Sequence, residues 1–179
     1  MAEEEYTYEY IVVHLPHLIL ASGSPRRKQW LEALRIPFTL VIPNIDETPH
    51  LNEGAQALVE RLAQAKAEHV GRDHSESWVL AADTTVSLKG KILNKPVDSS
   101  DAMVMLQSLQ GQTHEVHTAC CLRRKERSFL IHDVARVTFR SMSEKEIKWY
   151  VSTKEPMDKA GAYAIQGQGA YFIEKVEGS

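Results

Sequence analysis

The chain has 179 residues, 43% of them hydrophobic and 25% charged, and this composition excludes a disordered, collagen-like or low-complexity protein. A chain of this length buries roughly 70% of the surface that its unfolded state exposes, so its core needs no disulfide to be stable. The 21 basic and 24 acidic residues give a net charge of −3, which provides no overall positive field for a nucleic acid polymer or an anionic membrane.

The two cysteines and the first residues indicate a compartment. Cys120 and Cys121 are adjacent, and neighbouring residues of a strand point to opposite faces, so we expect no structural disulfide between them. The start of the chain is acidic where a signal peptide is basic, and no stretch approaches the ~20 apolar residues of a membrane span. We therefore expect a cytoplasmic protein, with an extension at 1–16 followed by a single domain at 17–179.

The first half of the chain alternates strand and helix signals. Ser22-Gly-Ser-Pro25 combines a turn glycine with a proline suited to the first helical position, directly after a short apolar run. In chain order, the patterns predict a strand at 17–21, a helix at 25–35, a strand at 38–42, a loop at 43–54 and an amphipathic helix from 55 to about 71.

The second half contains clearer capping signals. Asp98 and Asp101 can cap one helix, and Ser143 with Glu146 has the spacing of a capping box for another. The expected elements are a strand at 78–82, a hairpin at 84–93, a helix ending at Gly111, strands at 115–123 and 128–140, a helix after Ser143, and a last strand at 170–176. This mixture predicts an α/β or α+β fold.

The turn before the first helix is the strongest local signal for chemistry. A glycine-serine turn that leads into a helix N-terminus offers unpaired N–H groups to an anion, and Arg26 and Arg27 add two planar groups for phosphate oxygens. The alternative is that Ser24 and Pro25 only cap a helix whose arginines are solvated. The segment is not a Walker loop, because the Gly-Lys-Ser/Thr ending is missing.

Two charged residues, Lys66 and Asp83, lie in apolar surroundings, where an unpaired charge is unfavourable. Lys66 lies on the helix face that Leu58 and Leu62 bury, so it either has a partner or extends its ammonium group to the rim of the core. Asp83 follows the apolar run 78–82, and α/β proteins place ligand-binding side chains beyond the carboxyl ends of strands. A turn-forming aspartate is the alternative.

Weaker signals complete the set. Asp46-Glu47 in a proline-bordered loop offers oxygen ligands for Mg²⁺ or Mn²⁺, although such pairs are often only solvated. Lys95 and Lys159 add cations at the ends of elements. The pairs His14/His17 and His114/His117 have no third ligand at zinc-site spacing, so we interpret these histidines as surface or strand residues and both cysteines as core residues.

Taken in order, these blocks resemble the Maf family of nucleoside triphosphate pyrophosphatases over nearly all of 18–179. The blocks are Leu20-Ala-Ser-Gly-Ser-Pro-Arg-Arg27, Asp46-Glu47, Leu62-Ala-x-x-Lys-Ala67, Ala82-Asp-Thr84, Asn94-Lys-Pro96, Gly111-x-x-His114 and Lys159-Ala-Gly-Ala-Tyr-x-Ile-Gln-Gly167. The resemblance implies an inosine-triphosphatase-like (Maf/Ham1) fold, an elongated two-lobed mixed sheet flanked by helices with a central cleft. It also implies a homodimer and hydrolysis of a nucleoside triphosphate with a divalent metal.

The resemblance also suggests a branch and a set of roles. The block ending in Gln166-Gly167 is similar to the branch acting on dTTP and UTP, so pyrimidine triphosphates, including modified uridine nucleotides, are the expected substrates. The expected roles are catalysis by Asp83, Lys66 and Glu47, metal binding by Asp83 and Glu47, and substrate binding by Ser22, Ser24, Arg26, Arg27, Lys95, Lys159 and Gln166.

Departures from the family pattern keep other functions open. Gln112 replaces a usual arginine, Ala135 a common threonine, and family members usually continue beyond Ser179 through an Asn-Val-x-Gly-x-Pro segment. Nucleotidyl transfer is an alternative because transferases also grip a triphosphate with a glycine-serine turn followed by arginine. A nucleotide-binding regulator of cell division without turnover is the third hypothesis.

Overall fold

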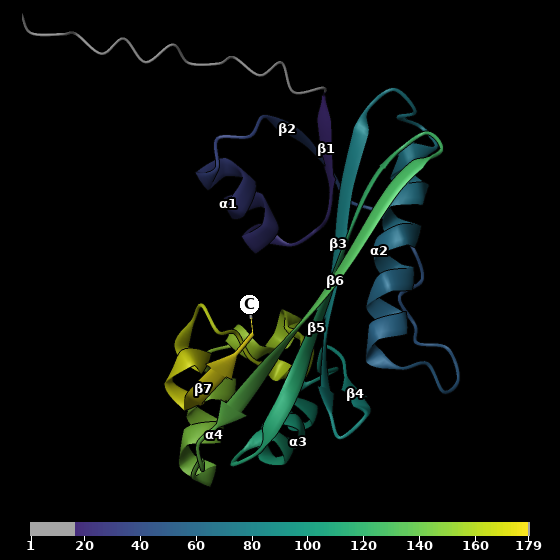
Figure 1. Ribbon diagram of the computed structural model, residues 1–179. Helices are drawn as coiled ribbons and strands as arrows, with labels where there is room; N and C mark the ends of the chain where they lie inside the picture. Colours follow the sequence, from purple (N-terminus) through teal and green to yellow (C-terminus); the bar gives the residue numbers. More distant parts are fainter. Residues whose placement is uncertain (1–16, 179) are drawn as a thin grey trace, which may run out of the picture.

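A seven-stranded mixed sheet organises the part of the chain that the computed structural model describes, residues 17–178 (Figure 1). The strand order is β2-β1-β3-β5-β6-β7, with β4 beside β3. The strands are β1 (Leu18–Ala21), β2 (Phe38–Val41), β3 (Trp78–Leu88), β4 (Lys91–Leu93), β5 (Thr113–Arg124), β6 (Arg127–Phe139) and β7 (Ile173–Glu177). The helices are α1 (Pro25–Ala33), α2 (Ala55–Gly71), α3 (Ser99–Leu109) and α4 (Glu144–Ser152).

The first three strands are parallel, and helices make their connections. α1 connects β1 to β2, and α2 connects β2 to β3, as parallel strands require. β1 pairs with β3 only as far as Ala21 opposite Ala81. Beyond that pair β1 has ended while β3 continues, so the chain that follows β1 and the next residues of β3 border a common opening.

The long antiparallel strands connect two lobes. β3, β5 and β6 run the length of the molecule, with α1, β1 and β2 beside one end and α3, α4 and β7 at the other (Figure 1). The prediction of a strand at 78–82 and a separate hairpin was wrong at their junction, because β3 is one continuous strand. Asp83 pairs with Ala119 of β5 inside this strand and does not end it.

Each lobe has its own apolar core. Where α2 packs on the sheet, small residues such as Ala63, Ala67, Ala81 and Ala119 are fully buried and allow the helix to approach closely. The other core lies among α3, α4 and the end of β6, around Leu106, Phe139, Tyr150 and Phe172. The expected α/β, two-lobed fold is confirmed.

Local signals placed most elements correctly. Pro25 is the first residue of α1, Asp98 caps α3 through the Asp101 N–H, and Ser143 and Glu146 form both bonds of the capping box of α4. The last strand begins later than predicted, because three short 3-10 helices precede it. These are η1 (Glu155–Asp158), η2 (Ala160–Ala162) and η3 (Gln168–Phe172).

The structure also bears on the expectations about membrane spans, the N-terminal extension and the two cysteines. Among residues 17–178, no helix is long and apolar enough to cross a membrane. The extension at 1–16, including His14, lies outside the described residues. Cys120 and Cys121 are free thiols, as expected, and Cys121 is buried in the core under α2 while Cys120 is only partly buried.

Candidate active site

A cleft of about 1280 Å³ opens between the two lobes, where β1 ends and β3 continues. Residues from the turn before α1, the loop before α2, α2 itself, β3 and the segment after η1 line it. All ten residues predicted for the site are among them: Ser22, Ser24, Arg26, Arg27, Glu47, Lys66, Asp83, Lys95, Lys159 and Gln166. The structure therefore brings the predicted residues together, while their roles remain predictions.

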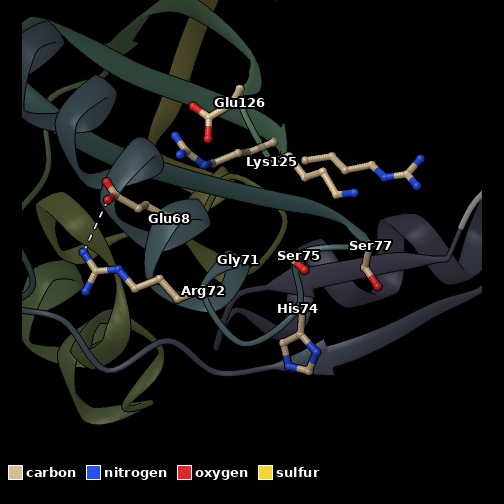
Figure 2. A pocket seen from close by; sticks show the side chains of 10 residues that line it. Glu68, Gly71, Arg72, His74, Ser75, Ser77, Lys125 and Glu126 are labelled. Carbon is tan, nitrogen blue, oxygen red and sulfur yellow. Dashed lines mark hydrogen bonds and ion pairs between the residues drawn. The ribbon is translucent and has the colours of Figure 1, made fainter.

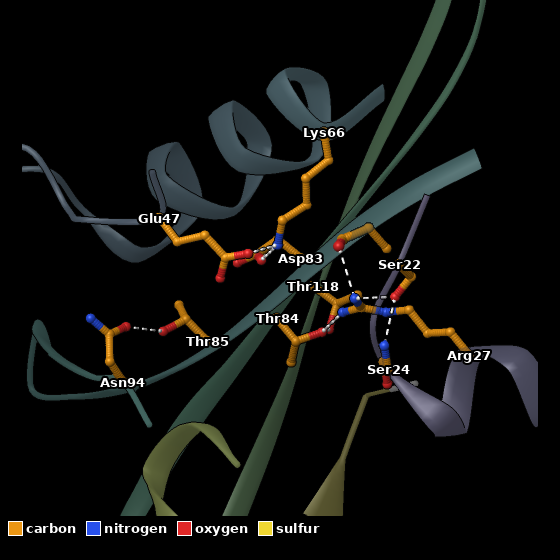
Figure 3. Close-up of polar contacts among 11 residues, drawn as sticks. Ser22, Ser24, Arg27, Glu47, Lys66, Asp83, Thr84, Thr85, Asn94 and Thr118 are labelled. Carbon is orange, nitrogen blue, oxygen red and sulfur yellow. Dashed lines mark hydrogen bonds and ion pairs between the residues drawn. The ribbon is translucent and has the colours of Figure 1, made fainter. Parts of the chain in front are cut away.

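Lys66 forms the electrostatic centre of this cleft. Its Nζ atom lies 2.6 Å from Asp83 Oδ1 and 2.8 Å from Glu47 Oε1, so two carboxylates converge on one ammonium group (Figure 3). Lys66 and Asp83 are 6% and 8% exposed, whereas the Glu47 side chain is 46% exposed at the cleft. Lys66 thus pairs with one buried and one half-exposed carboxylate and does not extend to solvent.

The surroundings of Asp83 alter its proton affinity. Burial raises the pKa of the Asp83 carboxyl group, and the nearby Glu47 charge acts in the same direction. The Lys66 ammonium, through its charge and its hydrogen bond, only partly opposes this increase. A carboxyl group with a raised pKa in a cleft is a stronger base than an ordinary surface aspartate.

The turn before α1 leaves donors available at the helix N-terminus. The Ser22 hydroxyl, on a buried residue, accepts a hydrogen bond from the Ser24 N–H and thereby fixes the turn. The Ser24 side chain makes no capping bond, although Ser24 is the N-cap residue. The interpretation of Ser24 as merely a side-chain cap is therefore wrong, and its hydroxyl is free to face the cleft.

Arg26 and Arg27 lie in different surroundings. The Arg27 guanidinium group donates hydrogen bonds to the Ala82 carbonyl oxygen at 2.9 Å and to Thr84 Oγ1 at 3.0 Å, and these two residues flank Asp83 (Figure 3). It also contacts Ser22 Oγ at 3.4 Å. Arg26 makes no hydrogen bond or ion pair within residues 17–178, so its guanidinium group is the one that a ligand can use.

Three of the predicted residues that line the cleft, Lys95, Lys159 and Gln166, lie outside the turn before α1 and the Lys66–Asp83 pair. Lys95 follows β4, and Lys159 lies beside Asp158, with which it forms an ion pair. Gln166 is exposed in the loop between η2 and η3, next to the half-exposed Ile165. These residues add polar and apolar groups to the lining of the cleft.

Sequence reasoning missed several residues of the cleft. Thr84 links Arg27 to Thr118 of β5, since the two threonine hydroxyls lie 3.1 Å apart. Tyr163, whose hydroxyl is 2.8 Å from Nε2 of the buried His114, also lines the cleft. The block resemblance includes Thr84 and Tyr163 without giving them a role and does not include Thr118, because neither threonine nor tyrosine carries a distinctive local signal.

A second and smaller cavity, of about 220 Å³, lies near the C-terminal end of α2 (Figure 2). Of the charged groups that line it, Arg72 contacts Glu68, while Lys125 and Arg124 contact Glu76, which lies outside its lining. None of the ten predicted residues lines it. The large cleft is therefore the candidate active site.

The histidines form no additional metal centre within the described part of the chain. No group of three or more histidine, cysteine, aspartate or glutamate side chains is arranged there to hold a metal ion by itself. His117 stacks on His132, and His114 is fully buried, in agreement with their interpretation as strand residues.

A family model described as "Maf-like protein" matches residues 17–179. The chain belongs to this family. Among similar Maf relatives, the dTTP/UTP pyrophosphatase of Myxococcus xanthus strain DK1622 is 50% identical over 163 residues, which are 90% of this chain and 82% of the relative. The dTTP/UTP pyrophosphatase of Bacillus cytotoxicus strain NVH 391-98 is 46% identical over 160 residues, 89% of this chain and 84% of the relative.

Solved structures support the fold of this Maf chain. The Ham1 protein of Staphylococcus aureus has a TM-score of 0.52 at 12% identity, covering 87% of this chain and 90% of that one. A HAM1 protein from Coxiella burnetii has a TM-score of 0.50 at 14% identity, with 88% and 91% covered. These similarities show a shared Ham1-like architecture.

Proposed function

We propose that this chain hydrolyses dTTP and UTP to the nucleoside monophosphate and pyrophosphate, with water attacking the α-phosphorus, and that residues 17–179 form one catalytic unit. The observation that carries the proposal is the buried Lys66–Asp83 pair beside an open turn with unpaired donors. The names of the relatives from Myxococcus xanthus and Bacillus cytotoxicus support the same reaction and substrates.

The cationic groups of the cleft suit the phosphate chain. A triphosphate carries about four negative charges, and fixed cations can offset them before a nucleophile approaches. Arg26, Lys95 and Lys159 line the cleft, and the N-terminus of α1 adds N–H groups and the Ser24 hydroxyl. We assign these groups to the phosphates, and we assign Arg27 to holding β3 on both sides of Asp83.

Asp83 is the proposed base. Its carboxylate accepts a proton from a water molecule, which then attacks the α-phosphorus in line with the leaving pyrophosphate. Lys66 keeps the Asp83 side chain in position through the 2.6 Å contact and offsets negative charge that develops on the phosphoryl oxygens. Burial raises the pKa of Asp83, which makes its carboxylate a stronger base for this proton transfer.

A divalent cation, Mg²⁺ or Mn²⁺, fits the donor set of the cleft. Asp83 and Glu47 converge on one positive group, and Mg²⁺ in nucleotide enzymes is typically held by one or two carboxylates together with substrate phosphates. We propose that Asp83 and Glu47 hold this cation. When bound, it supplies charge neutralisation and polarisation of the phosphoryl group.

Gln166 is the proposed reader of the base. Gln166 is exposed and lines the cleft, and an amide can pair its donor and acceptor with the adjacent carbonyl and N–H groups of uracil or thymine. We expect Gln166→Ala to flatten the preference for dTTP and UTP over ATP and GTP while some turnover remains. An equal loss for all four nucleotides would instead assign Gln166 to the phosphates or to a water molecule.

The assembly and location follow from weaker observations. Exposed Phe129 and Ile131 of β6, at 60% and 69% exposure, provide apolar surface for the proposed homodimer. Sedimentation velocity measures this assembly, and a monomer at all concentrations would refute it.

The free thiols of Cys120 and Cys121 support a reducing, cytoplasmic location.

The test of the proposed function is pyrophosphate release from dTTP, UTP, ATP and GTP, each with and without Mg²⁺ and without an acceptor. We expect release with Mg²⁺, at a higher kcat/KM for dTTP and UTP. Release only after an acceptor is added would indicate nucleotidyl transfer. Tight nucleotide binding without any release would indicate a regulator.

A further inference from the structure

The loop that carries Gln166 is anchored by its backbone. Tyr163 and Ala164 are buried, but Ile165 to Gln168 are exposed, so side-chain packing cannot define the position of the tip. Two backbone groups of this loop, the N–H groups of Gln168 and Gly169, lie 3.0 Å and 3.1 Å from the Glu155 carboxylate, to which they donate hydrogen bonds. The C-terminal side of the tip is thus fixed to one carboxylate.

The N-terminal side of the tip is connected to the same carboxylate through Tyr150. The Tyr150 hydroxyl donates to Glu155 Oε1 at 2.7 Å and accepts a hydrogen bond from the Ala164 N–H at 3.1 Å. The Tyr150 ring is fully buried in the core between α3 and α4, so this link has a rigid base. Both ends of the exposed tip therefore depend on Glu155.

Gly167 and Gly169 have no room for a side chain, because the loop backbone passes close to Glu155 and Tyr150. A Cβ atom at Gly167 would overlap the Glu155 carboxylate, and one at Gly169 would lie 2.6 Å from the Tyr150 hydroxyl oxygen and 2.7 Å from the Ala164 carbonyl oxygen. Real Cβ atoms do not approach this closely. The two glycines of Gln166-Gly-Gln-Gly169 thus allow the backbone to approach the Glu155 carboxylate closely.

Glu155 is ionised in this setting. Burial opposes its ionisation, but hydrogen bonds from the Gln168 N–H, the Tyr150 hydroxyl and the Gly169 N–H outweigh burial and hold the pKa of Glu155 below its ordinary value. Hydrogen bonds to an ionised carboxylate are stronger than bonds between neutral groups. The negative charge of Glu155 thus strengthens the hydrogen bonds that it accepts from the Gln168 and Gly169 N–H groups.

We propose that Glu155 is a positioning residue that determines base selectivity by fixing the loop on which Gln166 presents its amide. The proposal rests on the proposed function, because it takes Gln166 as the base reader. Glu155 itself does not line the cleft. Its effect therefore passes through the loop, and it should change substrate preference more than the chemical step.

The test is Glu155→Gln, which keeps the side-chain size but replaces one acceptor oxygen with an NH₂ group facing backbone donors. We expect the ratio of kcat/KM for dTTP to that for ATP to fall about tenfold, mainly through the KM for dTTP. Tyr150→Phe removes only the hydroxyl link and should lower the ratio by a smaller factor. Amide hydrogen exchange in 164–169 should accelerate in both variants.

Glu146→Gln is the matched control. Glu146 also accepts several hydrogen bonds, from Ser143 and Arg140, and lies in the same lobe, but it does not touch the loop. This variant should lose stability and keep the wild-type ratio. An unchanged ratio in Glu155→Gln, with or without a change in exchange at 164–169, or an equal loss of selectivity in Glu146→Gln, would overturn the proposal.

A further arm separates this proposal from the proposed function. Binding of the non-hydrolysable α,β-imido analogues of UTP and ATP reports base preference without turnover. If the wild-type protein releases no pyrophosphate, the proposed function fails, and the analogue-binding ratio of Glu155→Gln against wild type still decides the role of Glu155. A reduced ratio supports that role, and an identical ratio refutes it.

Discussion

Replacing Lys66 with methionine removes the positive charge between Asp83 and Glu47 and keeps most of the apolar stem. Removing one partner of a buried ion pair costs about 3–5 kcal/mol of unfolding free energy. Glu47 is 46% exposed and the cleft is open, so water can reach the remaining carboxylates. We therefore expect the low end of that range, about 3 kcal/mol, which lowers the Tm of a domain of this size by about 6–12 °C.

The same variant should change how stability depends on pH. Without the Lys66 charge, the already raised pKa of Asp83 rises further, so the folded protein binds a proton that the unfolded chain releases. Stability then decreases as pH rises from the unfolded-state pKa of Asp83 to its raised folded-state pKa, and it recovers on acidification through that window. Chemical denaturation at a series of pH values measures this recovery. Pyrophosphate release should fall about 100-fold or more.

Lys28→Met is the matched control, because Lys28 pairs with Glu32 one turn along α1 with both side chains about half exposed. Exposed pairs of this kind contribute only about 0.3–0.5 kcal/mol. The control should therefore change neither Tm nor activity appreciably. A Lys66→Met protein as stable as wild type at pH 7, with no gain on acidification, would show that our account of the buried pair is wrong.

Three further substitutions test separate parts of the site. Asp83→Asn should abolish most hydrolysis and leave nucleotide binding largely intact, and a near-normal kcat would remove Asp83 from the role of base. Arg26→Ala should raise the KM with little change in Tm, whereas Arg27→Ala should also lower the unfolding free energy by about 1–3 kcal/mol, because it leaves the Ala82 carbonyl oxygen without its donor. Equal Tm values for the two variants would contradict this division. Burial lowers the pKa of His114 to about 4, so the unfolded chain binds more protons between pH 6.5 and 4 and stability should fall by up to about 3 kcal/mol as pH falls through that window. His114→Gln should flatten this slope in denaturation experiments, and an unchanged slope would assign the titration to another group.

Short-range signals explain what the sequence could predict. Pro25, Asp98 and the Ser143/Glu146 pair act within one helical turn, so the starts of α1, α3 and α4 follow from neighbouring residues alone. The position of Lys66 on the buried face of α2 required a partner, and the structure provides Asp83 and Glu47. The ordered blocks of the family then brought the remaining cleft residues into one hypothesis.

Contacts between distant segments explain what the sequence could not predict. β3 continues through Asp83 because β5 pairs with it on both sides of that residue, and the polar interruption of the apolar run was misread as a strand end. The role of Arg27 at the phosphates stays a prediction, but no local signal indicated that its guanidinium group is bonded to Ala82 and Thr84, more than fifty residues away. Neither the β3–β5 pairing around Asp83 nor the Arg27 hydrogen bonds can be predicted from residues within a single turn or strand.

The central claim is that water attacks the α-phosphorus, and hydrolysis of dTTP in ¹⁸O-labelled water tests it most directly. Mass spectrometry of the products shows which one carries the label. We predict one ¹⁸O atom in dTMP and none in pyrophosphate after a single turnover with Mg²⁺. Label in pyrophosphate, or dTDP and labelled phosphate as products, would contradict the mechanism assigned to Asp83 and its cleft.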